Sequence, residues 1–211
     1  LDEEVHLDFL QSLPLIYTLL PNKGVHPIFK ASMNVIYSLI YKWIEGGKCQ
    51  EDSVYPADPD SEYGWEKLFS ERLYMSFKRN HGLDAKVARF HNIFGPEGAW
   101  NNGKEKAPAA ICRKVAQATE GGEIEIWGDG LQTRSFLFID DCLNAVRAFM
   151  KSNEEGPFNI GSEEMISIND YANVVAEISG KSINIKNIEG PTGVRGRCSD
   201  NAIIESKMGW K

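Results

Sequence analysis

Along most of this chain, apolar residues switch between the spacing of helices and the spacing of strands, and this alternation restricts the fold more than any other feature. Helices are predicted at 62–79, 107–118 and 139–150, and in a segment that starts at Ser167 or Asn169 and ends at Gly180. Strands are predicted at 85–94, 124–127, 157–160 and 183–188. Strands that alternate with helices of about 10 to 15 residues indicate βαβ units and a mainly parallel sheet. The predicted fold class is therefore α/β.

The first part of the chain is less regular. An apolar helix is predicted at 5–20, with a break near Pro14, and a short strand at 26–31. Residues 45–62 are rich in Gly, Asp, Ser and Pro and are predicted to form a loop. Acidic residues precede the apolar helix, where a signal peptide would carry positive charge, so no targeting segment is expected. Because the chain begins at Leu1, we expect it to be a piece of something longer.

The composition is that of an ordinary soluble chain with room for one domain, or for one domain and a small annex. It has 211 residues, of which 42% are hydrophobic and 25% charged. A formal charge of −7 without a basic run argues against nucleic acid as a partner, and no apolar stretch reaches the roughly 18 residues of a membrane span. The cysteines form no CxxC pair, so neither a metal site nor a disulfide framework is predicted, and a reducing intracellular setting is favoured. They are Cys49, Cys112, Cys142 and Cys198.

The first candidate for chemistry is the pair Tyr63 and Lys67 in the helix predicted at 62–79. A spacing of four places both side chains on one helical face. A nearby ammonium lowers the pKa of a phenol, so Tyr63 could act as a base near neutral pH. An exposed helical pair without a catalytic role is the alternative interpretation.

Two further candidates lie where a strand gives way to a loop and where a helix begins. Asn92 precedes a Gly/Pro loop at the end of a predicted strand, where open α/β sheets bind ligands, although it could equally satisfy the loop backbone. The segment 104–108 places cations at a helix start, where they oppose the helix dipole. An anionic ligand would compensate them, and so would solvation of the charges.

The last two candidates are loops with glycine and arginine. The turn at 127–136 places Gln132 and Arg134 just before a run of apolar residues that is predicted to be buried. The segment 193–197 carries Arg195 and Arg197, whose guanidinium groups suit forked contacts with phosphate. Each could be a plain surface loop, but together the five blocks indicate a site for a polar, negatively charged small molecule.

In this order, the blocks resemble the extended short-chain dehydrogenases/reductases that act on nucleotide sugars. The wording of five segments is similar to the GDP-mannose 3,5-epimerases within that family: "ARFHNIFGP", "GKEKAPAAICRK", "WGDGLQTRSFLFID", "FNIGSEEMISIN" and "GVRGRCSDN". The resemblance is dense from about Glu51 to Trp210. It implies the second half of a Rossmann-type parallel sheet and a small C-terminal α/β substrate-binding domain. Residues 1–91 would be a remnant of the NAD-binding domain, and 92–211 mainly the nucleotide-sugar domain, with segments returning to the first sheet.

The resemblance implies an NAD-dependent isomerase that converts GDP-mannose to GDP-L-galactose through a C4-keto intermediate and inversion at C3 and C5. Tyr63 matches the base at the C4 hydroxyl, Lys67 the lysine that holds the nicotinamide ribose, and Lys106 one group of the acid/base pair. It also implies a cytoplasmic enzyme of L-ascorbate biosynthesis that can form a homodimer. The matching substrate-contact positions are Asn92, Glu105, Lys106, Ala107, Lys114, Gln132, Thr133, Arg134 and Arg197, with Arg195 as a weaker candidate.

The sequence departs from the family at two places. Where the family has a loop Ser-Ser-x-Cys-x-Tyr-Pro, this chain has Met33 for the second serine and Val35 for the catalytic cysteine. Neither side chain can transfer a proton, and Cys49 is too close to Tyr63 in the chain to substitute for that cysteine. No GxGxxG occurs, so the pyrophosphate of NAD lacks its usual anchor. We therefore expect weak NAD binding and little double epimerisation.

Two alternatives to that reading stay open. Another nucleotide-sugar 4-epimerase or dehydratase would share Tyr63, Lys67 and the Gln132/Arg134 turn, but it has no obvious need for Lys106. A non-catalytic remnant would account for Met33, Val35 and the absent glycine motif.

Overall fold

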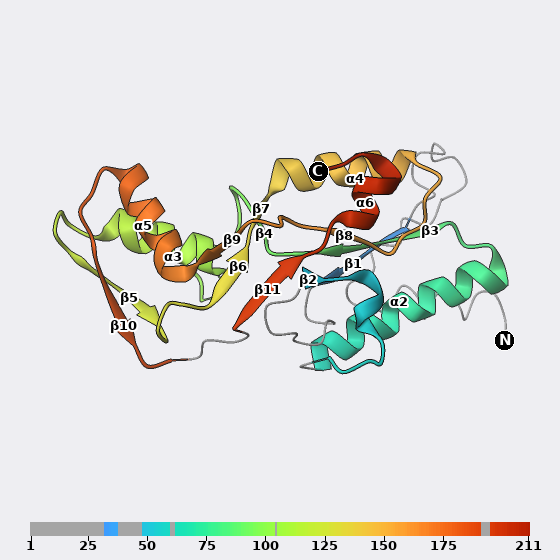
Figure 1. Cartoon of the computed structure of the whole chain (residues 1–211), viewed down its shortest axis with the longest axis horizontal. Helices are drawn as coiled ribbons and strands as arrows, with labels where there is room; N and C mark the ends of the chain where they lie inside the picture. The colour runs from blue at the N-terminus through green and yellow to red at the C-terminus, as the bar shows by residue number, and fades with distance from the viewer. Residues whose placement is uncertain (1–31, 38–47, 60–61, 104, 191–194) are drawn as a thin grey trace.

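The computed structural model describes residues 32–37, 48–59, 62–103, 105–190 and 195–211. Figure 1 shows an elongated molecule in which one lobe holds α2, α4, α6 and the strands between them, and the other holds α3, α5, β5 and β10. A third group of strands lies between these two lobes (Figure 1). The mixed α/β class with parallel strands that the sequence predicts is confirmed.

The first lobe is built on a parallel sheet with the order β1-β3-β8. The strands are β1 (Ser32–Tyr37), β3 (Ala85–Phe90) and β8 (Phe158–Ile160). On one side lies the helix α2 (Glu62–His81), and on the other lie α4 (Ile139–Lys151) and α6 (Ala202–Met208) (Figure 1). Val87 packs with Leu68 of α2, whereas Ala88 packs with Phe149 of α4. Neighbouring residues of β3 thus serve cores on opposite faces of the sheet.

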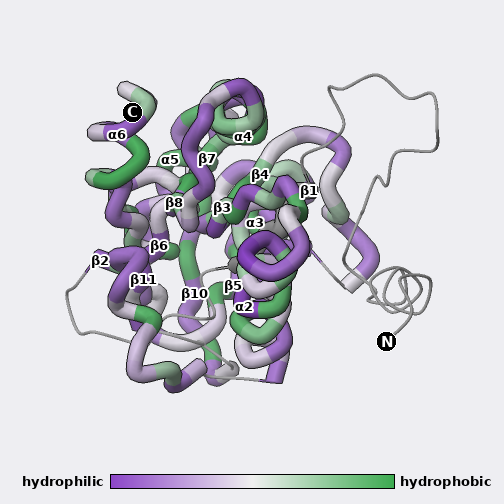
Figure 2. Tube along the Cα trace, turned by 90° about the vertical axis from the view of Figure 1, so that its right-hand side faces the viewer, coloured by the Kyte–Doolittle hydropathy of each residue, from purple (hydrophilic) through white to green (hydrophobic). Residues whose placement is uncertain are grey.

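The second lobe has a smaller core of its own. The strands β5 (Glu123–Trp127) and β10 (Asn184–Ile188) pair in parallel, and the helices α3 (Ala107–Gln117) and α5 (Ile168–Ser179) contact each other beside them. Ile111 and Val115 of α3 pack with Ile124 and Ile126 of β5. The helices carry both hydrophilic and hydrophobic stretches (Figure 2), as expected for helices that cover a core with one face.

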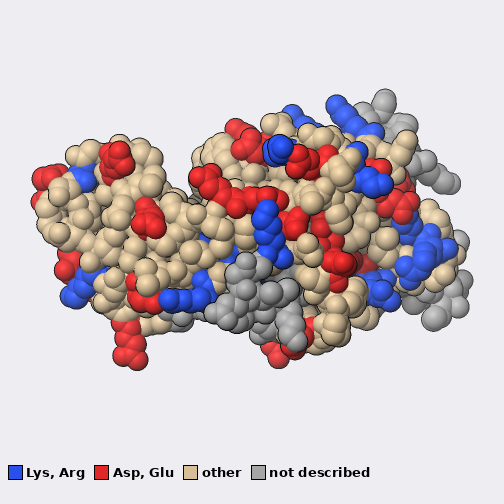
Figure 3. Space-filling view, in the orientation of Figure 1, with Lys and Arg blue, Asp and Glu red and all other residues tan. Residues whose placement is uncertain are grey.

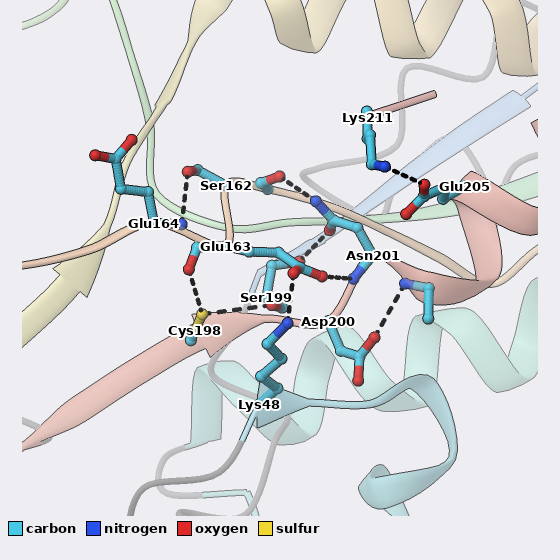
Figure 4. Close-up of polar contacts among 12 residues, drawn as sticks. Lys48, Ser162, Glu163, Glu164, Cys198, Ser199, Asp200, Asn201, Glu205 and Lys211 are labelled. Carbon is cyan, nitrogen blue, oxygen red and sulfur yellow. Dashed lines mark hydrogen bonds and ion pairs between the residues drawn. The ribbon is translucent and has the colours of Figure 1, made fainter. Parts of the chain in front are cut away.

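Short strands connect the lobes. The sheet β2-β11-β6-β9 contains β2 (Lys48–Cys49), β11 (Gly196–Ser199), β6 (Thr133–Ser135) and β9 (Met165–Ser167), and β4 (Ile93–Phe94) pairs with β7 (Leu137–Phe138). Figure 4 shows Glu163, which follows β8, between the Lys48 ammonium and the backbone N–H of Asn201. The Asn201 amide donates to Gly161 O at 2.6 Å and accepts from Ser199 Oγ at 2.6 Å. These bonds fasten β2, β11 and α6 to the end of β8.

Most of the elements predicted from periodicity are confirmed, and Ser167 rather than Asn169 caps α5, accepting from Asp170 N–H. The strand predicted at 85–94 is wrong at its end, because Asn92 has a φ of 47° and divides it into β3 and β4. Residues 32–37, expected in a loop, form β1, whose β-branched and aromatic residues favour a strand. The loop predicted at 45–62 contains β2 and the 3₁₀ helix η3 (Glu51–Val54).

The remaining sequence expectations fall outside what the structure describes or tests. The helix predicted at 5–20 and the strand at 26–31 lie outside the described residues, and the division into 1–91 and 92–211 stays a prediction. Among the described residues, no helix is long and apolar enough to cross a bilayer, and no cluster of three His, Cys, Asp or Glu side chains could hold a metal ion.

Candidate functional site

Tyr63 and Lys67 meet in the first turns of α2, as their spacing predicts. The Lys67 ammonium lies 4.9 Å from the centroid of the Tyr63 ring and 3.1 Å from Glu66 Oε1. Lys67 is only 3% exposed. Burial of a lysine among an aromatic ring and one carboxylate strengthens its electrostatic attraction to the ring. The helix therefore presents a phenol with an ammonium fixed beside it.

Asn92 joins the first lobe to the connecting strands through its backbone and its side-chain amide. Its Nδ2 donates to Ser135 O at 2.9 Å, and its own carbonyl accepts from Leu137 N–H at 3.3 Å. These bonds hold the end of β3 against β6 and β7. The structure thus shows Asn92 satisfying loop backbone, the alternative that the sequence left beside ligand binding.

A cavity of about 440 Å³ in the second lobe gathers five of the residues predicted to contact substrate. It lies between α3, β5 and the start of β6. The five are Glu105, Ala107, Lys114, Gln132 and Arg134. The sequence reasoning missed Trp127, Arg113 and Ile126, which also line it. The available signal in the sequence was the alternation Glu-Ile-Glu-Ile-Trp at 123–127, which places Trp127 on the polar side of the strand, where it is 54% exposed.

Gln132 gives this cavity its most specific polar group. The side chain is 6% exposed, and its Nε2 donates to Trp127 O at 3.1 Å. That bond fixes the amide so that Oε1 is buried without a hydrogen-bond partner among the described residues. A buried acceptor left unsatisfied costs about 1 to 3 kcal/mol. A ligand that donates a hydrogen bond to Oε1 would recover that cost.

Two guanidinium groups lie side by side next to the same cavity. Arg134 of β6 pairs in register with Arg197 of β11, which is 7% exposed. Burial lowers the pKa of Arg134, and the neighbouring charge of Arg197 lowers it further. Arg134 nevertheless stays protonated, because the reference pKa of arginine is so high. Lys114 adds a third cation, although its ammonium donates to Glu125 O.

This concentration of cations contrasts with the surface in general. In the view of Figure 3, acidic side chains are scattered over both lobes, in keeping with the formal charge of −7. Thr133, between Gln132 and Arg134, pairs with Gly196 of β11. A ligand in the 440 Å³ cavity therefore meets cations from β6 and α3, close to Arg197 on β11.

Glu105 stabilises the loop before α3. Its carboxylate accepts from Arg113 Nη2 at 3.0 Å and from Asn102 N–H at 3.3 Å. Backbone N–H groups, its own first and then those of Gly103 and Asn102, lower the pKa of this carboxyl, and Arg113 lowers it further. Glu105 thus neutralises Arg113 at one edge of the cavity.

Lys106 is separated from the other predicted contacts. It is the exposed N-cap residue of α3 and lines a second cavity of about 620 Å³, whose walls include Phe94, Phe138 and Tyr171. This cavity is mostly apolar. Neither cavity lining includes Tyr63 or Lys67. The structure therefore places the predicted site residues at the start of α2, in the 440 Å³ cavity, at the N-terminus of α3, in the β6–β11 pair beside the cavity and, for Asn92, at the end of β3.

Cys49 does not substitute for the cysteine that the family pattern requires. Its side chain is 8% exposed, and burial raises the pKa of the thiol to about 11. A thiol with that pKa transfers protons poorly at neutral pH. Met33 and Val35 pair with Lys86 and Ala88 in the register of β1 with β3.

The residues fit NAD at one end only. The pair Tyr63 and Lys67 offers a hydroxyl and a buried ammonium, which suit the ribose next to the nicotinamide. The 211-residue sequence has no GxGxxG for the pyrophosphate.

The parallel strands joined by helices define a Rossmann-type α/β protein, with a Tyr/Lys pair on one helix and a cationic cavity in the second lobe. The chain matches the NAD dependent epimerase/dehydratase family over residues 39–161, more than half of its length, and belongs to that family. The resemblance found in the sequence is thereby confirmed.

Among curated proteins, the chain is 45% identical over 187 residues to GDP-mannose 3,5-epimerase 1 of Oryza sativa subsp. indica, covering 89% of this chain and 49% of that protein. It is 46% identical over 189 residues to GDP-mannose 3,5-epimerase of Arabidopsis thaliana, again covering 49% of the relative. UDP-glucuronic acid decarboxylase 3 of Arabidopsis thaliana is 30% identical over 160 residues. The chain spans about half the length of these relatives.

Solved structures share the fold. UDP-N-acetylglucosamine 4-epimerase of Methanobrevibacter ruminantium M1 superposes with a TM-score of 0.78 at 22% identity, covering 87% of this chain and 57% of that one. UDP-glucuronic acid 4-epimerase of Bacillus cereus, solved with UDP-glucuronic acid and NAD, gives a TM-score of 0.73 at 25% identity, with 86% and 56% covered.

Proposed function

We propose that this chain is a homologue of GDP-mannose 3,5-epimerase that binds GDP-mannose with its diphosphate in the 440 Å³ cavity. The observation that carries this is the buried, unpartnered Oε1 of Gln132 beside Arg134. An acceptor next to cations calls for a ligand that has both donor groups and negative charge, as a nucleoside diphosphate sugar has. The identity to two plant GDP-mannose 3,5-epimerases supports GDP-mannose as that ligand.

In this proposal each candidate site residue has a defined task. Arg134, Arg197 and Lys114 neutralise the diphosphate, and Gln132 accepts from the nucleoside. Tyr63 takes the proton of the C4 hydroxyl, with Lys67 favouring the phenolate. Lys106 is next to Ala107, which lines the 440 Å³ cavity, so a sugar reaching past the first turn of α3 meets its ammonium. When bound, NAD would supply reversible hydride acceptance at C4.

The proposal includes binding with little or no turnover. Met33 and Val35 occupy the positions of the serine and cysteine of the family pattern, and the pKa of the Cys49 thiol is too high for it to replace them. A non-catalytic nucleotide-sugar-binding chain is therefore the second candidate function, supported by these residues. The resemblance also supports a cytoplasmic homodimer in L-ascorbate biosynthesis as part of the proposal.

Binding of GDP-mannose to the purified chain by titration calorimetry tests the proposed function. We expect Arg134→Gln and Gln132→Leu each to weaken binding about tenfold, which corresponds to about 1.4 kcal/mol. The matched control is Lys186→Gln, which removes an exposed cation of β10 that pairs with Glu123 at 3.3 Å and does not itself line the cavity. UDP-glucuronic acid, the substrate type named by the decarboxylase relative, serves as the competing ligand. Equal affinity of all three variants for GDP-mannose, or preference for the UDP sugar, contradicts the proposal.

A further inference from the structure

The turn between β5 and β6, residues 128–132, is held by bonds from two neighbouring elements. Gly128 N–H donates to Ile188 O of β10 at 2.8 Å. Asn169, in the first turn of α5, donates its N–H to Gly130 O at 3.0 Å and its Nδ2 to Asp129 O at 3.1 Å. The approach is so close that a Cβ on Gly130, which has a φ of 70°, would lie 1.8 Å from Asn169 Oδ1. Only glycine fits at that position.

Arg195 forms hydrogen bonds to the chain on both sides of Gln132. Its Nη1 donates to Asp129 Oδ1 at 2.9 Å and to Oδ2 at 2.7 Å, while its backbone carbonyl accepts from Thr133 N–H at 2.9 Å. Asp129 Oδ1 also accepts from Leu131 N–H at 2.9 Å. The side chain of Arg195 therefore holds the residue three before Gln132, and its backbone holds the residue directly after it.

These contacts give the two arginines of the segment different tasks. Arg197 lies buried next to Arg134, beside the cavity. Arg195 forms an ion pair with Asp129, in which the two side chains are 57% and 47% exposed, and it is not part of the cavity lining. Both bonds to the Asp129 carboxylate come from the Nη1 of Arg195, so the ion pair fixes the guanidinium against the turn and outside the cavity lining.

We infer that the Asp129–Arg195 ion pair is a clasp that positions Gln132 and Arg134 for ligand binding, without Arg195 touching the ligand. This inference rests on the proposed function. Because the pair is exposed, its contribution to global stability is small, about 0 to 1 kcal/mol. The ion pair acts on the geometry of the cavity wall. A small displacement of the Gln132 amide misaligns the hydrogen bond that its Oε1 accepts from a ligand.

A double-mutant cycle separates a clasp from a direct contact. We expect Asp129→Asn and Arg195→Gln each to weaken GDP-mannose binding about threefold to tenfold, with a double variant no weaker than either single one. Arg195→Lys, which keeps a charged donor, retains most of the affinity. The melting temperature of each variant stays within about 2 °C of the parent chain. The control pair Glu123→Gln and Lys186→Gln removes a comparable exposed ion pair between β5 and β10 and leaves the affinity unchanged.

A direct contact of Arg195 with the ligand gives a different pattern and overturns the inference. Arg195→Gln then weakens binding, whereas Asp129→Asn leaves it unchanged or strengthens it. Losses that add in the double variant contradict the clasp as well.

Hydrogen exchange provides a readout that needs no ligand. The amides of Leu131 and Thr133 donate to Asp129 and Arg195, so they exchange faster in Asp129→Asn and Arg195→Gln than in the parent chain and the control variants. Unchanged exchange at both amides overturns the clasp. If the parent chain fails to bind GDP-mannose but the exchange rates change as expected, the proposed function fails while the clasp itself stands.

Discussion

At the scale of single residues, burial decides which polar groups of this chain can take part in chemistry. Arg89 is 1% exposed and donates two bonds to the Glu71 carboxylate of α2, at 3.0 and 2.7 Å. Its Nη1 donates to Glu51 O at 2.7 Å. Arg89 thereby joins α2 and η3 to the sheet. Lys67, also buried, faces the Tyr63 ring instead. Arg89 and Lys67 are both buried cations, and the groups that surround each one set its role.

The cysteines show the same effect and give a test. Burial raises the pKa of Cys49 and of Cys142 to about 11, and it raises the pKa of Cys198 as well. Cys112 is exposed at the edge of the 620 Å³ cavity. Since only the thiolate reacts, iodoacetamide at pH 8 should modify Cys112 first and leave the others largely unmodified in the folded chain. Peptide mass spectrometry identifies the site. Cys112→Ser should abolish the fast reaction, and rapid labelling of Cys49 would contradict its burial.

At the scale of elements, the sequence predicts helices well because their signals are local. The apolar spacing of α2 and the Gly180 C-cap of α5, which has a φ of 69°, lie within the segments they define. The end of β3 was missed because it depends on a partner: Asn92 turns where its amide meets Ser135 O, 43 residues away. The strands β6 and β11 were missed for the same reason. Each has four residues or fewer, and each exists through pairing with the other.

The candidate site follows the same division. Tyr63 and Lys67 were predicted to lie together because four residues separate them on one helix. The placement of Gln132 and Arg134 beside Lys114 depends on how α3 packs over β5, which no local pattern records. Likewise, the separation of Lys106 from Ala107 into different cavities follows from the tertiary position of the α3 N-terminus.

The cap of α5 offers a test at this scale. Ser167 Oγ accepts from Asp170 N–H at 3.0 Å, which satisfies a donor that the helix leaves unpaired. Ser167→Ala should lower the free energy of unfolding by about 1 kcal/mol, as measured by urea denaturation. Ser206→Ala, which removes an exposed hydroxyl inside α6 that donates to Ile203 O, should change it by less than about 0.5 kcal/mol. Equal losses in both variants would mean that Ser167 is not acting as a cap.

At the scale of the whole molecule, the chain combines the sheet and helix that carry Tyr63 with a cationic cavity in a second lobe. Both parts belong to one family fold, and the chain spans about half the length of its plant relatives. The two parts differ in how complete their binding groups are. The cavity contains cations and a buried hydrogen-bond acceptor. The Tyr63 region has no glycine-rich turn in the sequence, and hydride transfer depends on the cofactor that such a turn anchors.

This chain should therefore bind a nucleotide sugar without binding the cofactor tightly. We expect GDP-mannose to bind, whereas NAD titrated into the 211-residue chain shows no micromolar affinity, because the pyrophosphate lacks its backbone donors. Incubation with GDP-mannose and NAD in deuterium oxide should leave C3 and C5 free of deuterium by NMR, since Val35 carries no transferable proton. The Arabidopsis thaliana GDP-mannose 3,5-epimerase, run in parallel, shows that the conditions support exchange. Micromolar NAD binding would refute the first expectation, and deuterium at either carbon would refute the second. Deuterium at C3 alone or C5 alone would show in addition that a single acid/base group acts, which Lys106→Met should then abolish.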